Sequence, residues 1–230
     1  MIRAVVFDFD GVIADSEPLH LLGFRSVLNN VGVELSESEY FSRYLGYDDA
    51  GVFLALAAER EINWTSAQID ALVERKAERL EELERQGSVL FPGAADAIER
   101  LSKRCPLAIA SGALGREILR VLEREDLRRY FAAVIAAEDT PAGKPAPDPY
   151  LGAVTRLSSV CGGNLEPASC AAVEDSQWGL QSARAAGLWT VGVTHTYPAS
   201  ALAAAHAIVP HLDHLTWEFV QTLPHAGSNG

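Results

Sequence analysis

From Pro92 onward, short apolar segments alternate with amphipathic helical segments, and this alternation restricts the possible folds more than any other feature. Strands that alternate with helices through short connections form parallel, doubly wound sheets. The sequence therefore predicts an α/β core. The expected strands cover residues 107–110, 133–137, 170–173, 190–193 and 207–209, and the expected helices cover residues 94–103, 115–125, 149–157 and 176–186.

One more buried strand is expected at Arg3–Phe7, which ends in a continuous apolar run. Residues 16–87 show only helical patterns, the clearest at about Ser66–Gln86. Because no strand is expected within this segment, the first strand must join the later sheet. We therefore predict a catalytic core made of residues 1–15 and 88–230 and an inserted all-helical cap domain made of residues 16–87.

Composition and charge restrict the partners of the chain. Its 230 residues are 48% hydrophobic, so a sizeable core is expected, and its net charge of −12 argues against a nucleic-acid surface. The three cysteines form no C-x-x-C pair, and we find neither a signal peptide nor a membrane span. We expect a cytoplasmic monomer that binds no membrane, with a frayed tail from Pro224.

Charged and polar residues follow several of the expected strands, at the points where these strands end. Because the carboxyl ends of parallel strands meet at one edge of a sheet, where open α/β sheets bind ligands, we expect these residues in a single crevice. Two acids beside a buried strand are also costly unless a cation binds them. The residues are Asp8, Asp10, Ser111, Gly112, Lys144, Glu174 and Asp175.

Each of these positions has a structural explanation when it is taken alone. The run Asp8–Gly11 can be an Asx-type turn, Ser111 and Glu174–Ser176 can cap helices, and Lys144 can be a solvated loop residue. Together they supply carboxylates for a hard cation such as Mg²⁺, and a hydroxyl, backbone N–H groups and a lysine for phosphate oxygens. This combination indicates phosphoryl transfer.

The chain resembles the haloacid dehalogenase (HAD) superfamily, in its β-phosphoglucomutase-like phosphatase branch. The resemblance extends over essentially the whole chain and implies a Rossmann-like core with an inserted helical cap. Four motifs carry it, and their order and approximate spacing also match. They are Asp8-Phe9-Asp10-Gly11-Val12, Ser111-Gly112, Gly143-Lys144-Pro145 and Glu174-Asp175-Ser176.

The resemblance implies roles for the acidic residues. Asp8 would be the nucleophile that forms an aspartyl-phosphate, and Asp10 the general acid and then the general base. Mg²⁺ would be held by Asp8, by the backbone carbonyl of Asp10 and by Asp175, with Glu174 at or next to the metal. Splitting phosphate ester hydrolysis through a covalent intermediate replaces one difficult step with two easier ones.

The resemblance also assigns the groups that would contact the substrate. Ser111 and nearby backbone amides, including that of Gly112, would hold the phosphoryl oxygens, and Lys144 would neutralise charge on the nucleophile and the phosphate. His20 and Lys76 fall where the mutase-like cap places substrate-contacting residues. As structural alternatives, His20 can be a helix-surface residue and Lys76 a solvated one.

We expect a Mg²⁺-dependent phosphatase of a small phosphorylated metabolite, in particular a sugar phosphate. A phosphomutase is one alternative, but the arginine that a mutase would carry after Gly46 is absent, and Asp48 and Asp49 would repel a second phosphate. The asparagine expected after the serine motif is also replaced, by Gly115. A non-enzymatic phospho-acceptor module is the other alternative, but it would need neither a general acid nor a large cap.

Overall fold

The structure is a computed structural model that describes residues 1–44 and 47–226. The chain divides into two compact units, one made of Met1–Asp15 with Val89–Gly230 and the other of Ser16–Ser88. Ser88, which we assigned to the core, thus belongs to the helical unit. Gly46, which the comparison with mutases used, lies outside the described residues.

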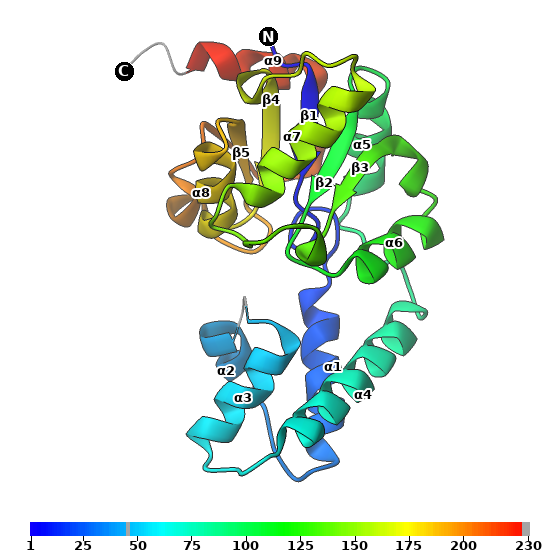
Figure 1. Cartoon of the computed structure of the whole chain (residues 1–230), viewed down its shortest axis with the longest axis vertical. Helices are drawn as coiled ribbons and strands as arrows, with labels where there is room; N and C mark the ends of the chain where they lie inside the picture. Colours follow the sequence, from blue (N-terminus) through cyan, green and yellow to red (C-terminus); the bar gives the residue numbers. More distant parts are fainter. Residues whose placement is uncertain (45–46, 227–230) are drawn as a thin grey trace. The chain divides into compact units, whose positions relative to one another are not determined.

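The first unit contains a six-stranded sheet in which every neighbouring pair of strands is parallel. Its order is β3-β2-β1-β4-β5-β6, so β1 lies between β2 and β4, as the sequence predicted. The α/β fold class is therefore confirmed (Figure 1). The strands are β1 (Ala4–Phe7), β2 (Leu107–Ala110), β3 (Phe131–Ile135), β4 (Cys170–Glu174), β5 (Trp189–Val193) and β6 (Ala207–Val209).

Helices pack against this sheet and enclose its strands. Helix α7 lies in front of the strands in the view of Figure 1 and contacts β1, β2 and β3, while α8 contacts β4 and β5. Alanines at Ala4, Ala108 and Ala172 let these helices approach the strands closely. The helices of this unit are α5 (Ala94–Ser102), α6 (Gly115–Arg124), α7 (Asp148–Val160), α8 (Gln177–Ala185) and α9 (Trp217–Ala226).

Several boundaries differ from the sequence prediction, and two of these differences have a clear physical reason. Strand β3 begins at Phe131, two residues earlier than expected, and this ring packs edge-to-face against Phe7 with centroids 6.3 Å apart. The prediction of fraying from Pro224 is wrong for the first residues of the tail, because α9 continues through this proline. Val220 and Leu223 are fully buried, and their packing offsets the loss of a helical hydrogen bond at the proline.

Every described secondary-structure element of the second unit is a helix, and the unit has its own apolar core, which includes Phe24, Leu28 and Phe53. Helix α4 begins with a capping box formed by Thr65 and Gln68. No described helix of either unit is both long and apolar enough to cross a membrane. The elements are α1 (Glu17–Asn29), α2 (Glu37–Glu39), a π-helical turn (Tyr40–Tyr44), α3 (Asp49–Glu59) and α4 (Ser66–Glu84).

Candidate active site

Three carboxylates meet where β1 and β4 end. Asp8 directly follows β1, Glu174 is the last residue of β4, and Asp175 follows it. One oxygen from each carboxylate lies within 4.8 Å of the others, and all three residues are buried. The pairing of Phe7 with Val173 brings these residues together, because it places the ends of the two strands side by side. Such a set of oxygen ligands can hold a divalent cation.

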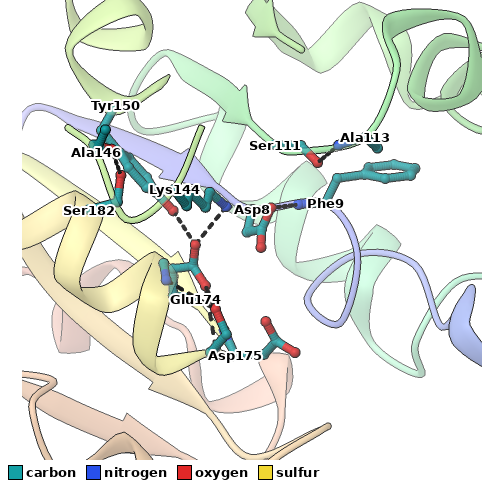
Figure 2. Close-up of polar contacts among 12 residues, drawn as sticks. Asp8, Phe9, Ser111, Ala113, Lys144, Ala146, Tyr150, Glu174, Asp175 and Ser182 are labelled. Atoms are coloured by element: carbon teal, nitrogen blue, oxygen red, sulfur yellow. Dashed lines mark hydrogen bonds and ion pairs between the residues drawn. The ribbon is translucent and has the colours of Figure 1, made fainter. Parts of the chain in front are cut away.

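Lys144 connects two members of this acid cluster. Its Nζ lies 2.8 Å from Asp8 Oδ1 and 2.7 Å from Glu174 Oε1 (Figure 2). Asp8 Oδ1 also accepts a hydrogen bond of 2.7 Å from the backbone N–H of Phe9. The lysine comes from the loop between β3 and α7, and only 12% of its side chain is exposed. Lys144 is therefore not the solvated loop residue that its sequence context alone allowed.

Glu174 is the best-anchored carboxylate of the cluster. Tyr150 on α7 donates its hydroxyl to Oε1 over 2.7 Å, and Ser176 donates its hydroxyl to Oε2 over 3.2 Å. A Cβ added at Gly179 on α8 would lie 1.8 Å from Oε1, so only glycine fits beside this carboxylate. Both oxygens of Glu174 thus have protein donors, which leaves Asp8 and Asp175 as the acids with more capacity for a cation.

The acid cluster carries more negative than positive charge. Burial and the nearby Glu174 raise the pKa of Asp8 well above its ordinary value, and the same two causes raise the pKa of Asp175 to about 7. Burial alone would lower the pKa of Lys144, but Asp8 and Glu174 outweigh it and raise that pKa. One lysine cannot offset three buried carboxylates, so the cluster favours binding a proton or a cation.

These shifts predict a pH-dependent stability in the absence of metal. Compared with an Asp175→Asn variant, the metal-free protein is expected to become less stable as the pH rises from about 4 to about 7. The reason is that folding raises the pKa of Asp175 from 3.8 to about 7, so the folded state retains a proton that the unfolded state has released. Urea unfolding in EDTA across this range measures the difference between the two proteins.

Excess Mg²⁺ is expected to oppose this loss, because it binds the ionised carboxylates of the folded state. Unfolding of both proteins in Mg²⁺ serves as the control, and Asp175→Asn should gain less from the ion. A metal-free protein whose stability rises relative to Asp175→Asn over the same range would contradict the raised pKa.

Asp10 and Gly11 form the turn that follows Asp8. Asp10 is half-buried, and its backbone forms an isolated β-bridge with that of Ala14. The N–H of Gly11 donates a hydrogen bond of 2.9 Å to the carbonyl of Ala14. Gly11 has a φ of +75°, which favours glycine, and a Cβ there would lie 2.0 Å from Asp175 Oδ2. The backbone of Gly11 is therefore in close contact with the Asp175 carboxylate.

Ser111 and Gly112 lie at the end of β2, the strand on the other side of β1. Ser111 is buried, its N–H donates to the carbonyl of Ile135, and its Oγ accepts from the N–H of Ala113 over 3.0 Å. The hydroxyl still has its own proton to donate. Gly112 is exposed, and a Cβ added there would meet no atom within 4 Å, so its backbone is open to a ligand.

His20 and Lys76 contact each other inside the helical unit. Lys76 Nζ lies 2.8 Å from His20 Nδ1 and 2.6 Å from Asp49 Oδ1, and it also lies over the ring of Phe24 at 4.8 Å. Lys76 is fully buried, so it is not the solvated residue that its sequence context allowed. Asp49, which we considered only as a repulsive charge, therefore forms an ion pair with this lysine.

Known proteins that are similar to this chain include phosphatases and a mutase. A family model described as haloacid dehalogenase-like hydrolase matches residues 5–193. A phosphorylated carbohydrates phosphatase from Thermotoga maritima is 34% identical over 84% of this chain and 86% of the relative. A β-phosphoglucomutase from Bacillus subtilis is 26% identical over 95% of this chain and 93% of the relative.

A solved structure, that of β-phosphoglucomutase from Clostridium difficile, has the same fold with a TM-score of 0.79. It is 20% identical, and the match covers 98% of both chains. The fold, the site and these relatives define an enzyme of the phosphoric monoester hydrolase class. The chain belongs to the haloacid dehalogenase-like hydrolase family, in its β-phosphoglucomutase-like branch, and the predicted family is confirmed.

Proposed function

We propose that the protein is a Mg²⁺-dependent phosphatase that hydrolyses a small phosphorylated metabolite, namely a sugar phosphate. The observation that carries the proposal is the ion pair between Lys144 and Asp8 within a buried cluster of three carboxylates. It places a fixed positive charge beside a carboxylate at a strand end of the sheet. The similarity to a phosphorylated carbohydrates phosphatase supports the choice of substrate class.

In this proposal Asp8 is the nucleophile and Asp10 moves the proton. A carboxylate oxygen of Asp8 attacks the phosphorus atom, the bond from phosphorus to the ester oxygen breaks, and the carboxyl proton of Asp10 passes to the leaving oxygen. Asp10 then takes a proton from water, which attacks the aspartyl-phosphate and releases inorganic phosphate. The two carboxyl groups are separated by one residue and have opposite tasks.

The donor set of the acid cluster fits a hard divalent cation, because its members are carboxylate oxygens whose buried charges are only partly compensated by Lys144. Asp8, Asp175 and the backbone carbonyl of Asp10 would hold Mg²⁺, and Glu174 would lie at or next to it. When bound, the ion would neutralise charge on the phosphate and on the nucleophile. Lys144 adds positive charge beside Asp8.

The remaining contacts to the substrate are also proposals. The Ser111 hydroxyl and the backbone N–H of Gly112 would bind phosphoryl oxygens as neutral donors. In the helical unit, His20 and Lys76 would contact the organic part of the substrate. The monomeric state and the cytoplasmic location stay predictions, the latter consistent with three free cysteines.

The similarity to a β-phosphoglucomutase keeps a phosphomutase as the second candidate. A mutase must hold a second phosphate group. The charge of Lys76 is already paired with Asp49, and Asp48 is occupied as the N-cap of α3, where it accepts from the N–H of Gly51 over 2.7 Å. Lys76 therefore offers no unpaired positive charge to a second phosphate group, and the acids Asp48 and Asp49 would repel it. Both points favour the phosphatase.

Phosphate release from a panel of phosphorylated sugars and nucleotides, with Mg²⁺ and with EDTA, tests the proposed function. We expect release from sugar phosphates with Mg²⁺ and none in EDTA. Hexose 1-phosphate with a bisphosphate activator tests the mutase in parallel. Isomerisation that exceeds phosphate release would establish the mutase. A stable acyl-phosphate without turnover on any substrate would establish a phospho-acceptor module instead.

A further inference from the structure

His195 lies two residues beyond the end of β5, at a strand end to which the sequence assigned no function. Its Nδ1 is 3.1 Å from the carbonyl oxygen of Gly11, and its ring stacks on Phe91 with centroids 4.0 Å apart. Its Nε2 is buried and has no hydrogen-bond partner among the described residues. Because a carbonyl oxygen can only accept, the ring must carry a proton on Nδ1 for this contact to be a hydrogen bond.

The hydrogen bond from His195 completes the restraint of the turn after Asp8. The N–H of Gly11 donates to Ala14, which fixes the peptide group whose carbonyl belongs to Asp10. The His195 ring fixes the next peptide group, whose carbonyl belongs to Gly11. Both peptide groups that flank the Gly11 Cα are thus held, and with them the φ and ψ angles of Gly11, so the orientation of the Asp10 carbonyl is restrained.

The neighbouring residue ties the same segment to the acid cluster. Thr196 forms a side-chain hydrogen bond with Asp175. A Cβ built on Gly11 would lie 2.9 Å from Thr196 Oγ1 and 2.0 Å from Asp175 Oδ2, so the three residues are in close contact. The segment after β5 therefore contacts both the turn that carries Asp10 and the acid that follows β4.

The stacking partner of His195 restrains the ring from a second direction. The N–H of Phe91 donates to the carbonyl of Ile13 over 3.0 Å, so the phenyl ring is attached to the same turn two residues after Gly11. The interplanar angle of 23° keeps the imidazole nearly parallel to this ring, with Nδ1 directed at Gly11. Burial lowers the pKa of His195 and so favours the neutral ring, although the bond to Gly11 acts in the opposite direction.

We propose that His195 is a positioning residue, whose Nδ1–H bond to Gly11 sets the orientation of the Asp10 carbonyl. It acts through Gly11 and exchanges no proton with the substrate. The inference rests on the role of Asp10 in the proposed function. It predicts an effect on the chemical step and on metal affinity, with little effect on substrate binding.

Two substitutions separate the hydrogen bond from the bulk of the ring. His195→Leu removes the donor, and His195→Asn keeps an amide N–H near the position of Nδ1. With sugar phosphate as substrate, we expect His195→Leu to lower kcat about 10-fold, with KM changed less than about twofold. The Mg²⁺ concentration for half-maximal rate should rise, and His195→Asn should recover most of kcat.

His206→Leu is the matched control. The side chain of this half-buried histidine forms hydrogen bonds only with Thr190 among the described residues, so kcat should not change in this variant.

Three outcomes would overturn the proposal. They are a wild-type kcat in folded His195→Leu protein, an Asn variant no better than the Leu variant, and a wild-type His195 that carries its proton on Nε2. Long-range ¹H–¹⁵N NMR of the wild-type imidazoles decides the last point even where a variant fails to fold, and the Nδ1–H tautomer supports the proposal. A wild-type protein that releases no phosphate overturns the proposed function, whereas an active wild type with insensitive variants overturns this inference alone.

Discussion

Replacing Asp8 by Asn is expected to lower turnover at least about 10⁴-fold, because the amide cannot act as a nucleophile and no other group can take its place. The fold should survive. Asp8 is a buried carboxylate whose pKa is raised by burial and by Glu174, so its negative charge opposes folding in the absence of metal. In EDTA at pH 8, the melting temperature of Asp8→Asn should therefore equal or exceed that of the wild type.

Phosphate release and thermal unfolding, each with Mg²⁺ and with EDTA, measure both parts of this prediction. The thermal shift caused by Mg²⁺ should be smaller in Asp8→Asn than in the wild type, since one carboxylate ligand is lost. Asp70→Asn is the matched control, because Asp70 is exposed on α4 and lies in the other unit. Hydrolysis that persists in Asp8→Asn protein with EDTA present would contradict the proposed mechanism.

The sheet and its functional edge could be predicted because their signals are local. Each strand is a short apolar run, and the polar residue that follows it marks the strand end. Strands that alternate with helices are parallel, so Asp8 and Glu174, which lie at strand ends, must share one edge of the sheet. The structure has their carboxylates in one cluster. The position of β1 between β2 and β4 followed from the same rule and is confirmed.

The supporting residues could not be predicted, because their signals are identical to those of ordinary core residues. Tyr150 occupies an apolar position of α7, and only the fold shows that its hydroxyl reaches Glu174, 24 positions away. Gly179 resembles any small residue of a helix until the position of its absent Cβ is compared with the Glu174 carboxylate. His195 contacts Gly11 across 184 positions of sequence. The polar residues that follow β5 are the one signal that the sequence offers for His195.

Replacing Lys144 by Met is expected to destabilise the metal-free protein by about 3–5 kcal/mol at neutral pH, because it leaves two buried carboxylates without their cation. Both Asp8 and Glu174 contact its Nζ directly. Turnover with Mg²⁺ should fall about 10³-fold, since a fixed charge beside the nucleophile and the phosphate is lost. Urea unfolding in EDTA and phosphate release with Mg²⁺ measure the two effects.

The pH dependence and a second substitution identify the cause of this loss. Near pH 5 the destabilisation by Lys144→Met should shrink, because Asp8, whose pKa is already raised by burial and by Glu174, then takes up a proton and its charge disappears. Adding Glu174→Gln should restore stability but not turnover. Lys103→Met, at an exposed lysine paired with Glu99, should leave the urea midpoint and turnover unchanged. If Lys144→Met is as stable as the wild type at neutral pH, the lysine is not what holds the buried acids together, and its role would be limited to binding phosphate.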